Sequence, residues 1–137
     1  MAKQSGLGWS TLSVDDSAGS AQAIINDITN AQWATPRGVQ DVTGIDKSGF
    51  ERILLLADFS ITLNGVFNSA ANQSHDVFKT VPSTSAQRTV TITTSGTAKT
   101  LACETLFTDY QVQRSENGEL TWQAPGVLAN GAVPTWA

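Results

Sequence analysis

The sequence predicts one mainly β domain: an antiparallel β-sandwich or closed barrel of about seven to eight strands with one short flanking α-helix. Phe59–Phe67 alternates apolar or small residues with polar residues, which indicates a strand with one buried face. Similar short runs recur along the chain, separated by Gly, Pro and Asn. The chain has 137 residues, of which 40% are hydrophobic and 15% charged, as expected for one folded domain spanning residues 1–137.

The first third of the chain is predicted to be extended. Residues 1–8 are small and polar and form a loose N-terminal arm. Trp9–Val14 alternates as a strand does, and Asp15–Ser20 is a turn cluster. Ala21–Ile28 fits a strand or a short helix, and the strand is favoured. Extended structure continues over Ile28–Ala34, because the following Pro36 disfavours helix at Thr35.

The centre of the chain combines a long connection with an ambiguous apolar run. Residues 36–48 contain little apolar material and are predicted to form a long loop. Ile53–Leu56 is continuously apolar and follows Ser48 and Glu51, which have the spacing of a capping box. We therefore predict one to two helical turns over Gly49–Leu55, before the strand that ends at Phe67.

The second half is predicted to hold the flanking helix and a series of strands. Ser74 is the expected N-cap of a helix within Asn72–Val81, which Pro82 ends. In the last strand before Asn117–Gly118, Tyr110 and Val112 are expected to face inward. The predicted strands are Arg88–Thr94, Lys99–Phe107 and Thr108–Arg114.

The chain is expected to end in a hairpin and an extended tail. Asn117–Gly118 is predicted to be a type I′ turn, because Asn and Gly tolerate positive φ best. Across this turn, Tyr110 and Val112 can face Leu120 and Trp122. Residues 124–137 are predicted to form a C-terminal extended segment in which Trp136 docks on the body.

No catalytic, metal or cofactor site is expected. Ser74, His75 and Asp76 are contiguous, so their side chains cannot align as nucleophile, base and orienting acid. One cysteine and one histidine do not make a zinc site, and Asp15–Asp16 lacks the further ligands of a calcium loop. Cys103 is expected to be a small buried hydrophobe. The sequence therefore predicts a protein that is not an enzyme.

The charge pattern argues against nucleic-acid binding. The net charge is −4, and the eight Lys and Arg residues are dispersed rather than clustered. No apolar run is long enough to span a membrane, and residues 1–9 lack the apolar core of a signal peptide. These features fit folding in a reducing cytoplasm.

An ordered series of motifs occupies the centre of the chain: Asp41–Gly44 reads DVTG, Asp46–Arg52 reads DKSGFER, and Leu56–Gly65 reads LADFSITLNG. This series resembles phage major tail tube proteins of long, non-contractile tails. The resemblance extends to Ser5–Asp16 and to Gly126–Ala137, and so covers nearly the whole chain. It implies hexameric rings whose strands form one inner barrel, and rings that stack into the conduit for genomic DNA.

The resemblance also implies partners and a location. The partners are other copies of this chain, a tape-measure protein, a tail terminator and distal tail proteins, while DNA passes through without specific binding. The protein would assemble in the bacterial host cytoplasm and reside in the virion tail. The long loop would contact other subunits through Arg37, Gln40, Asp41 and Asp46.

Three predicted strands carry polar faces without Lys or Arg, which suits the wall of a DNA channel. Basic side chains would retard DNA by pairing with phosphates, and mild acidity would repel the duplex toward the axis. The same faces also fit the ordinary solvent side of a sandwich. The residues expected to face the lumen are Thr62, Asn64, Thr91, Thr93, Gln111 and Gln113.

Two alternatives remain open at this stage. One is the tube protein of a contractile tail or injection apparatus, which shares the fold and ring geometry of the resembling family. The other is a small β-sandwich that binds carbohydrate or a cell surface. Such a module would need exposed aromatic side chains on one face, for which the candidates are Trp9, Trp33, Trp122 and Trp136.

Overall fold

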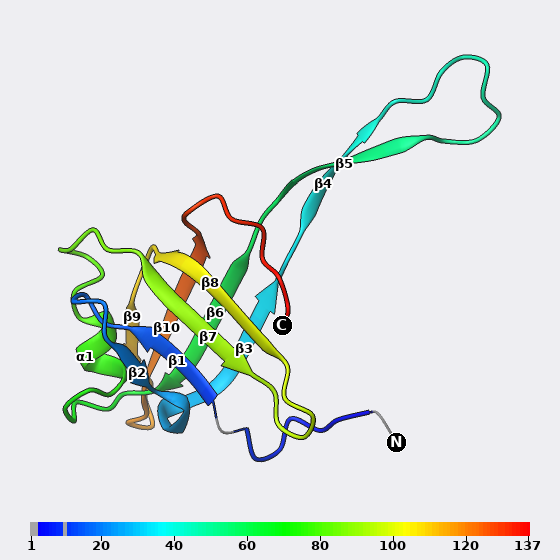
Figure 1. Ribbon diagram of the computed structural model, residues 1–137. Helices are drawn as coiled ribbons and strands as arrows, with labels where there is room; N and C mark the ends of the chain where they lie inside the picture. The colour runs from blue at the N-terminus through cyan, green and yellow to red at the C-terminus, as the bar shows by residue number, and fades with distance from the viewer. Residues whose placement is uncertain (1–2, 10) are drawn as a thin grey trace.

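Most strands belong to one antiparallel sheet that folds back on itself, as the computed structural model of residues 3–9 and 11–137 shows (Figure 1). The path through the sheet is β2-β1-β7-β8-β10-β6-β3, and β9 pairs with β10 off this path. The predicted mainly β fold is confirmed. The strands are β1 (Thr11–Asp15), β2 (Ala21–Ala23), β3 (Ile28–Ala34), β6 (Ser60–Val66), β7 (Arg88–Thr93), β8 (Thr100–Phe107), β9 (Gln111–Arg114) and β10 (Leu120–Leu128).

The folded sheet has two layers, with β2, β1, β7 and β8 in front of β9, β10, β6 and β3 (Figure 1). Strand β10 joins them, because Gly126–Leu128 pairs with β8 while Leu120–Gln123 pairs with β9 on the same side. Buried side chains of both layers fill the space between them. The alternation predicted for Phe59–Phe67 is observed, since Phe59, Ile61 and Leu63 are buried. Cys103 is buried in this core as predicted, and burial raises the pKa of its thiol.

Trp122 packs directly on Gly65 of the neighbouring strand. The two residues are cross-strand partners, and the indole Nε1 donates a hydrogen bond to Val66 O at 3.0 Å. A Cβ at Gly65 would lie 2.7 Å from Trp122 Cζ2 and 2.1 Å from Asp27 O, so the site accepts only glycine without rearrangement. This contact fixes β6 against β10 in the centre of the rear layer.

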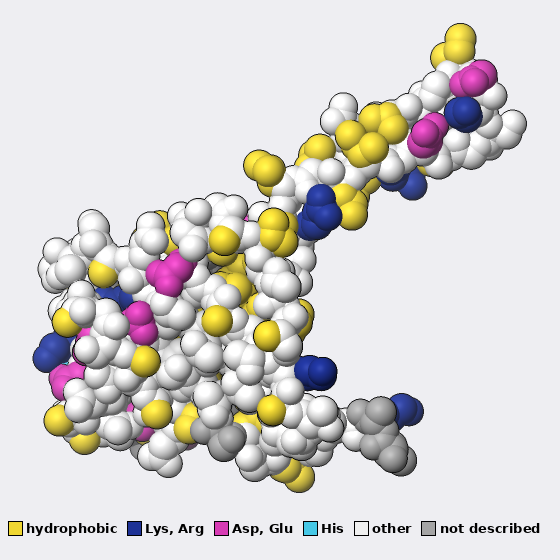
Figure 2. All heavy atoms as spheres, viewed as in Figure 1, with side chains coloured by type: hydrophobic (Ala, Val, Ile, Leu, Met, Phe, Trp, Pro, Cys, Tyr) yellow, Lys and Arg dark blue, Asp and Glu magenta, His cyan; other side chains and the backbone are white. Residues whose placement is uncertain are grey.

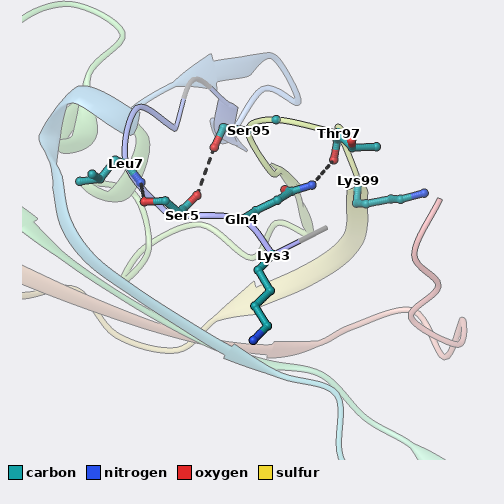
Figure 3. A pocket seen from close by; sticks show the side chains of 8 residues that line it. Lys3, Gln4, Ser5, Leu7, Ser95, Thr97 and Lys99 are labelled. Carbon is teal, nitrogen blue, oxygen red and sulfur yellow. Dashed lines mark hydrogen bonds between the residues drawn. The ribbon is translucent and has the colours of Figure 1, made fainter. Parts of the chain in front are cut away.

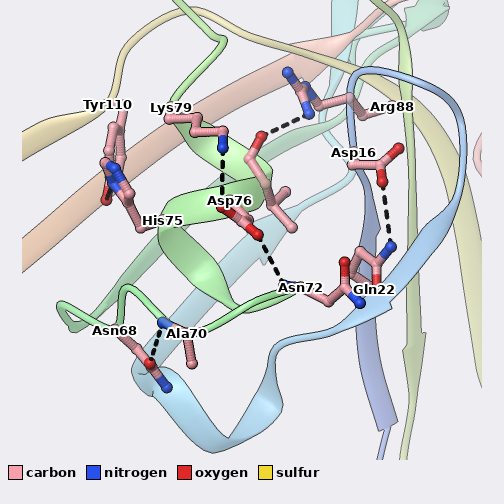
Figure 4. A network of polar contacts seen from close by, with 11 residues as sticks. Asp16, Gln22, Asn68, Ala70, Asn72, His75, Asp76, Lys79, Arg88 and Tyr110 are labelled. Atoms are coloured by element: carbon pink, nitrogen blue, oxygen red, sulfur yellow. Dashed lines mark hydrogen bonds and ion pairs between the residues drawn. The ribbon is translucent and has the colours of Figure 1, made fainter.

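The helix α1 (Ser74–Phe78) is held by a buried arginine (Figure 4). Arg88 Nη1 donates hydrogen bonds to Val77 O at 2.8 Å and to Asp15 O at 3.0 Å. Its Nη2 donates to Thr80 Oγ1 at 2.8 Å. Burial lowers the pKa of Arg88, although nearby acidic side chains oppose this shift. The guanidinium therefore ties the helix to strands β1 and β7.

The predicted N-cap of this helix was wrong. Gln73 occupies the N-cap position, and Ser74 Oγ is buried without a hydrogen-bond partner. The Asp27 carboxylate, on the short 3₁₀ helix Ile25–Asp27, accepts hydrogen bonds from Ser74 N at 3.0 Å and Asn68 Nδ2 at 2.8 Å. A carboxylate distant in sequence replaces the local cap, which no local motif can reveal.

Both terminal segments lie against β8 or the turn before it. Gln4 Nε2 donates to Thr97 O at 3.3 Å, and Ser95 Oγ donates to Ser5 O at 3.4 Å (Figure 3). At the other end, Ala137 exchanges two backbone hydrogen bonds with Thr100, and Trp136 bridges to Leu101. The segment that carries Trp136 therefore docks through its backbone, and Trp136 itself is 45% exposed. The prediction of a loose arm over residues 1–8 lies partly outside the described residues.

The central segment forms a long hairpin. The helix predicted over Gly49–Leu55 was wrong, and the loop predicted over residues 36–48 was wrong for residues 37–41, whereas residues 42–48 do form a loop. Arg37–Asp41 is strand β4 and Arg52–Ala57 is strand β5, and the two pair antiparallel (Figure 1). The hairpin is reinforced beyond β4, because Glu51 N donates to Thr43 Oγ1 at 2.8 Å. The apolar run therefore completes a ladder with β4 instead of forming a helix.

Other local expectations also need correction. Ala21–Ile28 is divided between β2 and the 3₁₀ helix rather than forming one strand, and residues 124–128 belong to β10 rather than to a separate tail. The turn at Asn117–Gly118 is not type I′, because only Gly118 has positive φ, at 91°. Gly118 N bonds to Ser115 O and Ser115 N to Glu119 O, a three-residue loop with glycine in the left-handed region. Val112, expected inside, is exposed at the sheet edge.

Gly65→Ala should lower the free energy of unfolding by about 1 to 3 kcal/mol, because the new methyl group collides with Trp122 and with the backbone oxygen of Asp27. Urea unfolding followed by tryptophan fluorescence measures this change. Gly49→Ala is the matched control, since a Cβ there meets nothing within 4 Å and the backbone φ is not positive. Equal stability of the two variants would contradict the packing of Trp122 on Gly65.

Candidate functional site

The β4–β5 hairpin exposes apolar side chains on both of its faces. Val39 is paired with Leu54, and the next pair, Gln40 with Ile53, points to the opposite face. Leu56 is 90% exposed, and Val39, Ile53, Leu54 and Leu55 are also exposed. Figure 2 shows hydrophobic side chains along the hairpin, which projects away from the body. An isolated hairpin of this kind has little stability of its own, so this surface is suited to contact with another molecule.

The four residues predicted to contact other subunits all lie on this hairpin. Arg37 Nε donates to Leu55 O at 2.9 Å near the body, and Gln40 is exposed in mid-strand. Asp41 accepts hydrogen bonds from the hydroxyl and the backbone N–H of Thr43, which lower the pKa of its carboxyl group. Asp46 lies in the distal loop, with its carboxylate 3.7 Å from Lys47 Nζ. The structure therefore groups these residues on one projecting element.

The outer face of the rear layer is lined by uncharged polar side chains. The register places four amides side by side across β3, β6, β10 and β9 in one row: Asn30, Asn64, Gln123 and Gln111. Gln32 and Thr62 pair in a neighbouring row, and Thr121 and Gln113 pair in another. Asp109 lies at the border, where it accepts a hydrogen bond from Gln111 Nε2 at 2.9 Å. We call these residues the amide face.

The six predicted lumen residues divide between two surfaces. Thr62, Asn64, Gln111 and Gln113 lie on the amide face. Thr91 and Thr93 lie on the outer face of the front layer, where they pair with Ser13 and Thr11 of β1. Because the layers pack back to back around one core, their outer faces point in opposite directions. Asn30, Gln32 and Gln123 were not predicted, because their placement depends on strand register.

The rear layer has an open strand at each edge. In the described residues, β3 pairs only with β6, and β9 pairs only with β10. An open edge presents unpaired backbone N–H and C=O groups that can extend the sheet with a further strand. The layer can therefore be extended at both edges by further strands.

The chemistry-bearing side chains are engaged in structural contacts. His75 Nδ1 lies 3.2 Å from the Tyr110 hydroxyl, and Asp76 forms an ion pair with Lys79 at 3.0 Å. A hollow of about 770 Å³ between the N-terminal segment and the 95–99 turn is lined by Lys3, Lys99, Leu7 and mostly uncharged polar residues (Figure 3). The described residues contain no group of three or more metal-ligating side chains, and no helix among them has the length and apolar character to span a membrane.

Comparison with known proteins shows which fold this is. No protein-family model and no curated protein sequence matches the chain. The chain is similar in structure to one in the tail of an empty gene transfer agent (GTA) particle, refined with C6 symmetry, with a TM-score of 0.71, 18% identity and coverage of 98% of both chains. A chain of the native GTA virion matches with a TM-score of 0.64 and 19% identity, over 90% of this chain and 95% of that one. The chain therefore shares its fold with components of phage-like particles.

Limited trypsin digestion should cut the free protein first at Lys47 and Arg52. Both lie on the hairpin, which is held only by its own ladder, whereas Arg88 is buried in the body. Mass spectrometry of the early fragments identifies the cleavage sites. Early cleavage after Arg88 would contradict the rigid body and exposed hairpin described here.

Proposed function

We propose that this protein is the structural subunit of a phage-like tail tube, in which hexameric rings of the chain stack into a conduit for DNA. The observation that carries this proposal is the full-length similarity to a tail chain in an assembly with C6 symmetry. The open edges, the amide face and the hairpin each supply a surface that such a tube requires. The likeness to major tail tube motifs of long, non-contractile tails supports the same role.

Ring closure is supported by the number and direction of the rear strands. The order β9-β10-β6-β3 is antiparallel throughout and contains four strands. Since four is even, β3 and β9 run in opposite directions. Rotation about an axis along the strands therefore brings β9 of one copy antiparallel to β3 of the next. Repeating this step gives a closed ring with no free edge.

The amide face is the surface that we assign to the lumen. Amide and hydroxyl groups keep the wall hydrated without the basic side chains that would hold phosphates. Thr62, Asn64, Gln111 and Gln113 are retained in this assignment, together with Asn30, Gln32 and Gln123. Thr91 and Thr93 are assigned instead to the outside of the tube, because they belong to the opposite layer.

The hairpin is assigned to contact between stacked rings. Its exposed leucines and valine would be buried against copies in the adjacent ring, with Arg37, Gln40, Asp41 and Asp46 as polar contacts. The tape-measure, terminator and distal tail proteins would set the length and ends of this tube, which would assemble in the bacterial cytoplasm and reside in the virion. A carbohydrate-binding role is less well supported, because Trp122 is buried and Trp9 and Trp33 pack on the core.

Replacing residues 40–54 with a short Gly-Ser turn should prevent stacking and leave ring formation intact, because the open edges of the body are unchanged. Negative-stain electron microscopy and sedimentation at high protein concentration distinguish rings from tubes. The wild-type protein should form tubes with a stain-filled channel under the same conditions. Tubes formed by the shortened variant would remove the stacking role of the hairpin, and a wild type that stays monomeric at every concentration would contradict the tube proposal.

Gln111→Arg should slow DNA ejection from virions built with the variant, because it adds six phosphate-binding groups to the lumen of each ring. Thr91→Arg is the matched control: it adds the same charge to the outside, where ejection should be unaffected. Fluorescence-monitored ejection measures both. A slower rate with Thr91→Arg and an unchanged rate with Gln111→Arg would reverse the assignment of the two layers.

A further inference from the structure

We propose that a hollow at the β3 edge is the receptor for Val112, which lies on the β9 edge of a second copy of this chain. This inference rests on the proposed ring and identifies the side chain that locks neighbouring subunits together. The inference describes an apolar side-chain contact between neighbouring subunits, which is additional to the backbone hydrogen bonds of strand pairing.

The hollow opens between the two layers beside β3 and has a volume of about 400 Å³. Trp9 and Trp33 form one wall, with ring centroids 5.4 Å apart. These two indoles bridge the front and rear layers, but they do not fill the space between them. The other apolar lining residues are Leu12, Ile25, Ile28 and Ala31. Gly6, Thr29 and Asn30 complete the lining. Because none of the lining side chains is charged and most are apolar, the hollow favours an aliphatic side chain over a charged one.

Val112 is an aliphatic side chain that is only about half covered in the single chain. It is the cross-strand partner of the buried Trp122, so it points toward the core side of the rear layer. Because β9 is the last strand at this edge, Val112 is nonetheless 45% exposed. The residue therefore has the orientation of a core side chain and lacks the neighbouring strand that would bury it.

The strand register aligns the two features. Ile28, Gly65, Trp122 and Val112 are successive partners in one row across β3, β6, β10 and β9. The row begins at Ile28, which lines the hollow, and ends at Val112 on the opposite edge. When β9 of a second copy pairs beside β3 in this row, its Val112 lies next to Ile28 on the core side of the sheet, at the hollow that Ala31 and Trp33 also line. The core of one copy is thereby completed by the next.

The first test compares Val112→Asp with Val66→Asp. Val66 is 51% exposed on the same layer but belongs to the opposite, amide face, so it is a matched control. Val112→Asp would place an unpaired carboxylate in the apolar hollow and should raise the concentration needed for ring formation at least tenfold, as measured by analytical ultracentrifugation. Val66→Asp should assemble like the wild type. Thermal melts followed by circular dichroism establish that both variants are folded.

The second test uses a cross-link and does not depend on a destabilising substitution. In a Cys103→Ser background, Val112→Cys and Ala31→Cys in one chain should be joined by a short bis-maleimide into covalent dimers and higher multiples, up to a closed hexamer. A product of monomer size only, or no cross-link in rings, would overturn the receptor assignment. Rings formed equally well by the wild type and Val112→Asp would also overturn it and would leave the tube role standing. A wild type that forms neither rings nor cross-links would contradict both.

Discussion

Strand β10 is the element on which the rest of the structure depends, because it pairs with three other strands. It bonds to β6 over most of its length on one side, and to both β9 and β8 on the other. Trp122 and Ala124 of this strand are buried, and Trp122 requires glycine at position 65. Because β10 pairs with strands of both layers, it holds the two layers together around the core. The rear layer then ends at β3 on one edge and at β9 on the other.

The body and the surfaces proposed for assembly differ in how completely their polar groups are hydrogen-bonded and their apolar side chains buried. In the body, the buried Arg88 and Asp27 each have several hydrogen-bond partners, and these fix α1 against both layers. In the hairpin, leucines remain exposed on both faces, and the rear layer ends in strands that are paired on one side only. The body therefore satisfies its own buried groups, whereas the hairpin and the open edges can still form favourable contacts with another molecule.

The sequence indicated the fold class because the periodicity of single strands depends on local burial. Ile61 and Leu63 alternate with Thr62 and Asn64 whether or not the pairing partners are known. The run Ile53–Leu56 was misread because four apolar residues in succession do not show the period-2 pattern of a half-buried strand, although the segment is strand β5 with exposed side chains. The alignment of Asn30, Asn64, Gln123 and Gln111 was not predictable, because it depends on the register of strands far apart in sequence. The same is true of the separation of Thr91 from Asn64.

In the proposed tube, the two open edges of the rear layer are closed by other copies of the chain. Hydrogen–deuterium exchange of the protein at low and high concentration tests this closure, because an unpaired edge amide exchanges quickly and a paired one slowly. Assembly should slow exchange in residues 28–34 and 111–114 together, with little change in residues 88–93 of the internal strand β7. Assembled particles in which both edges exchange as fast as in the free chain would contradict it.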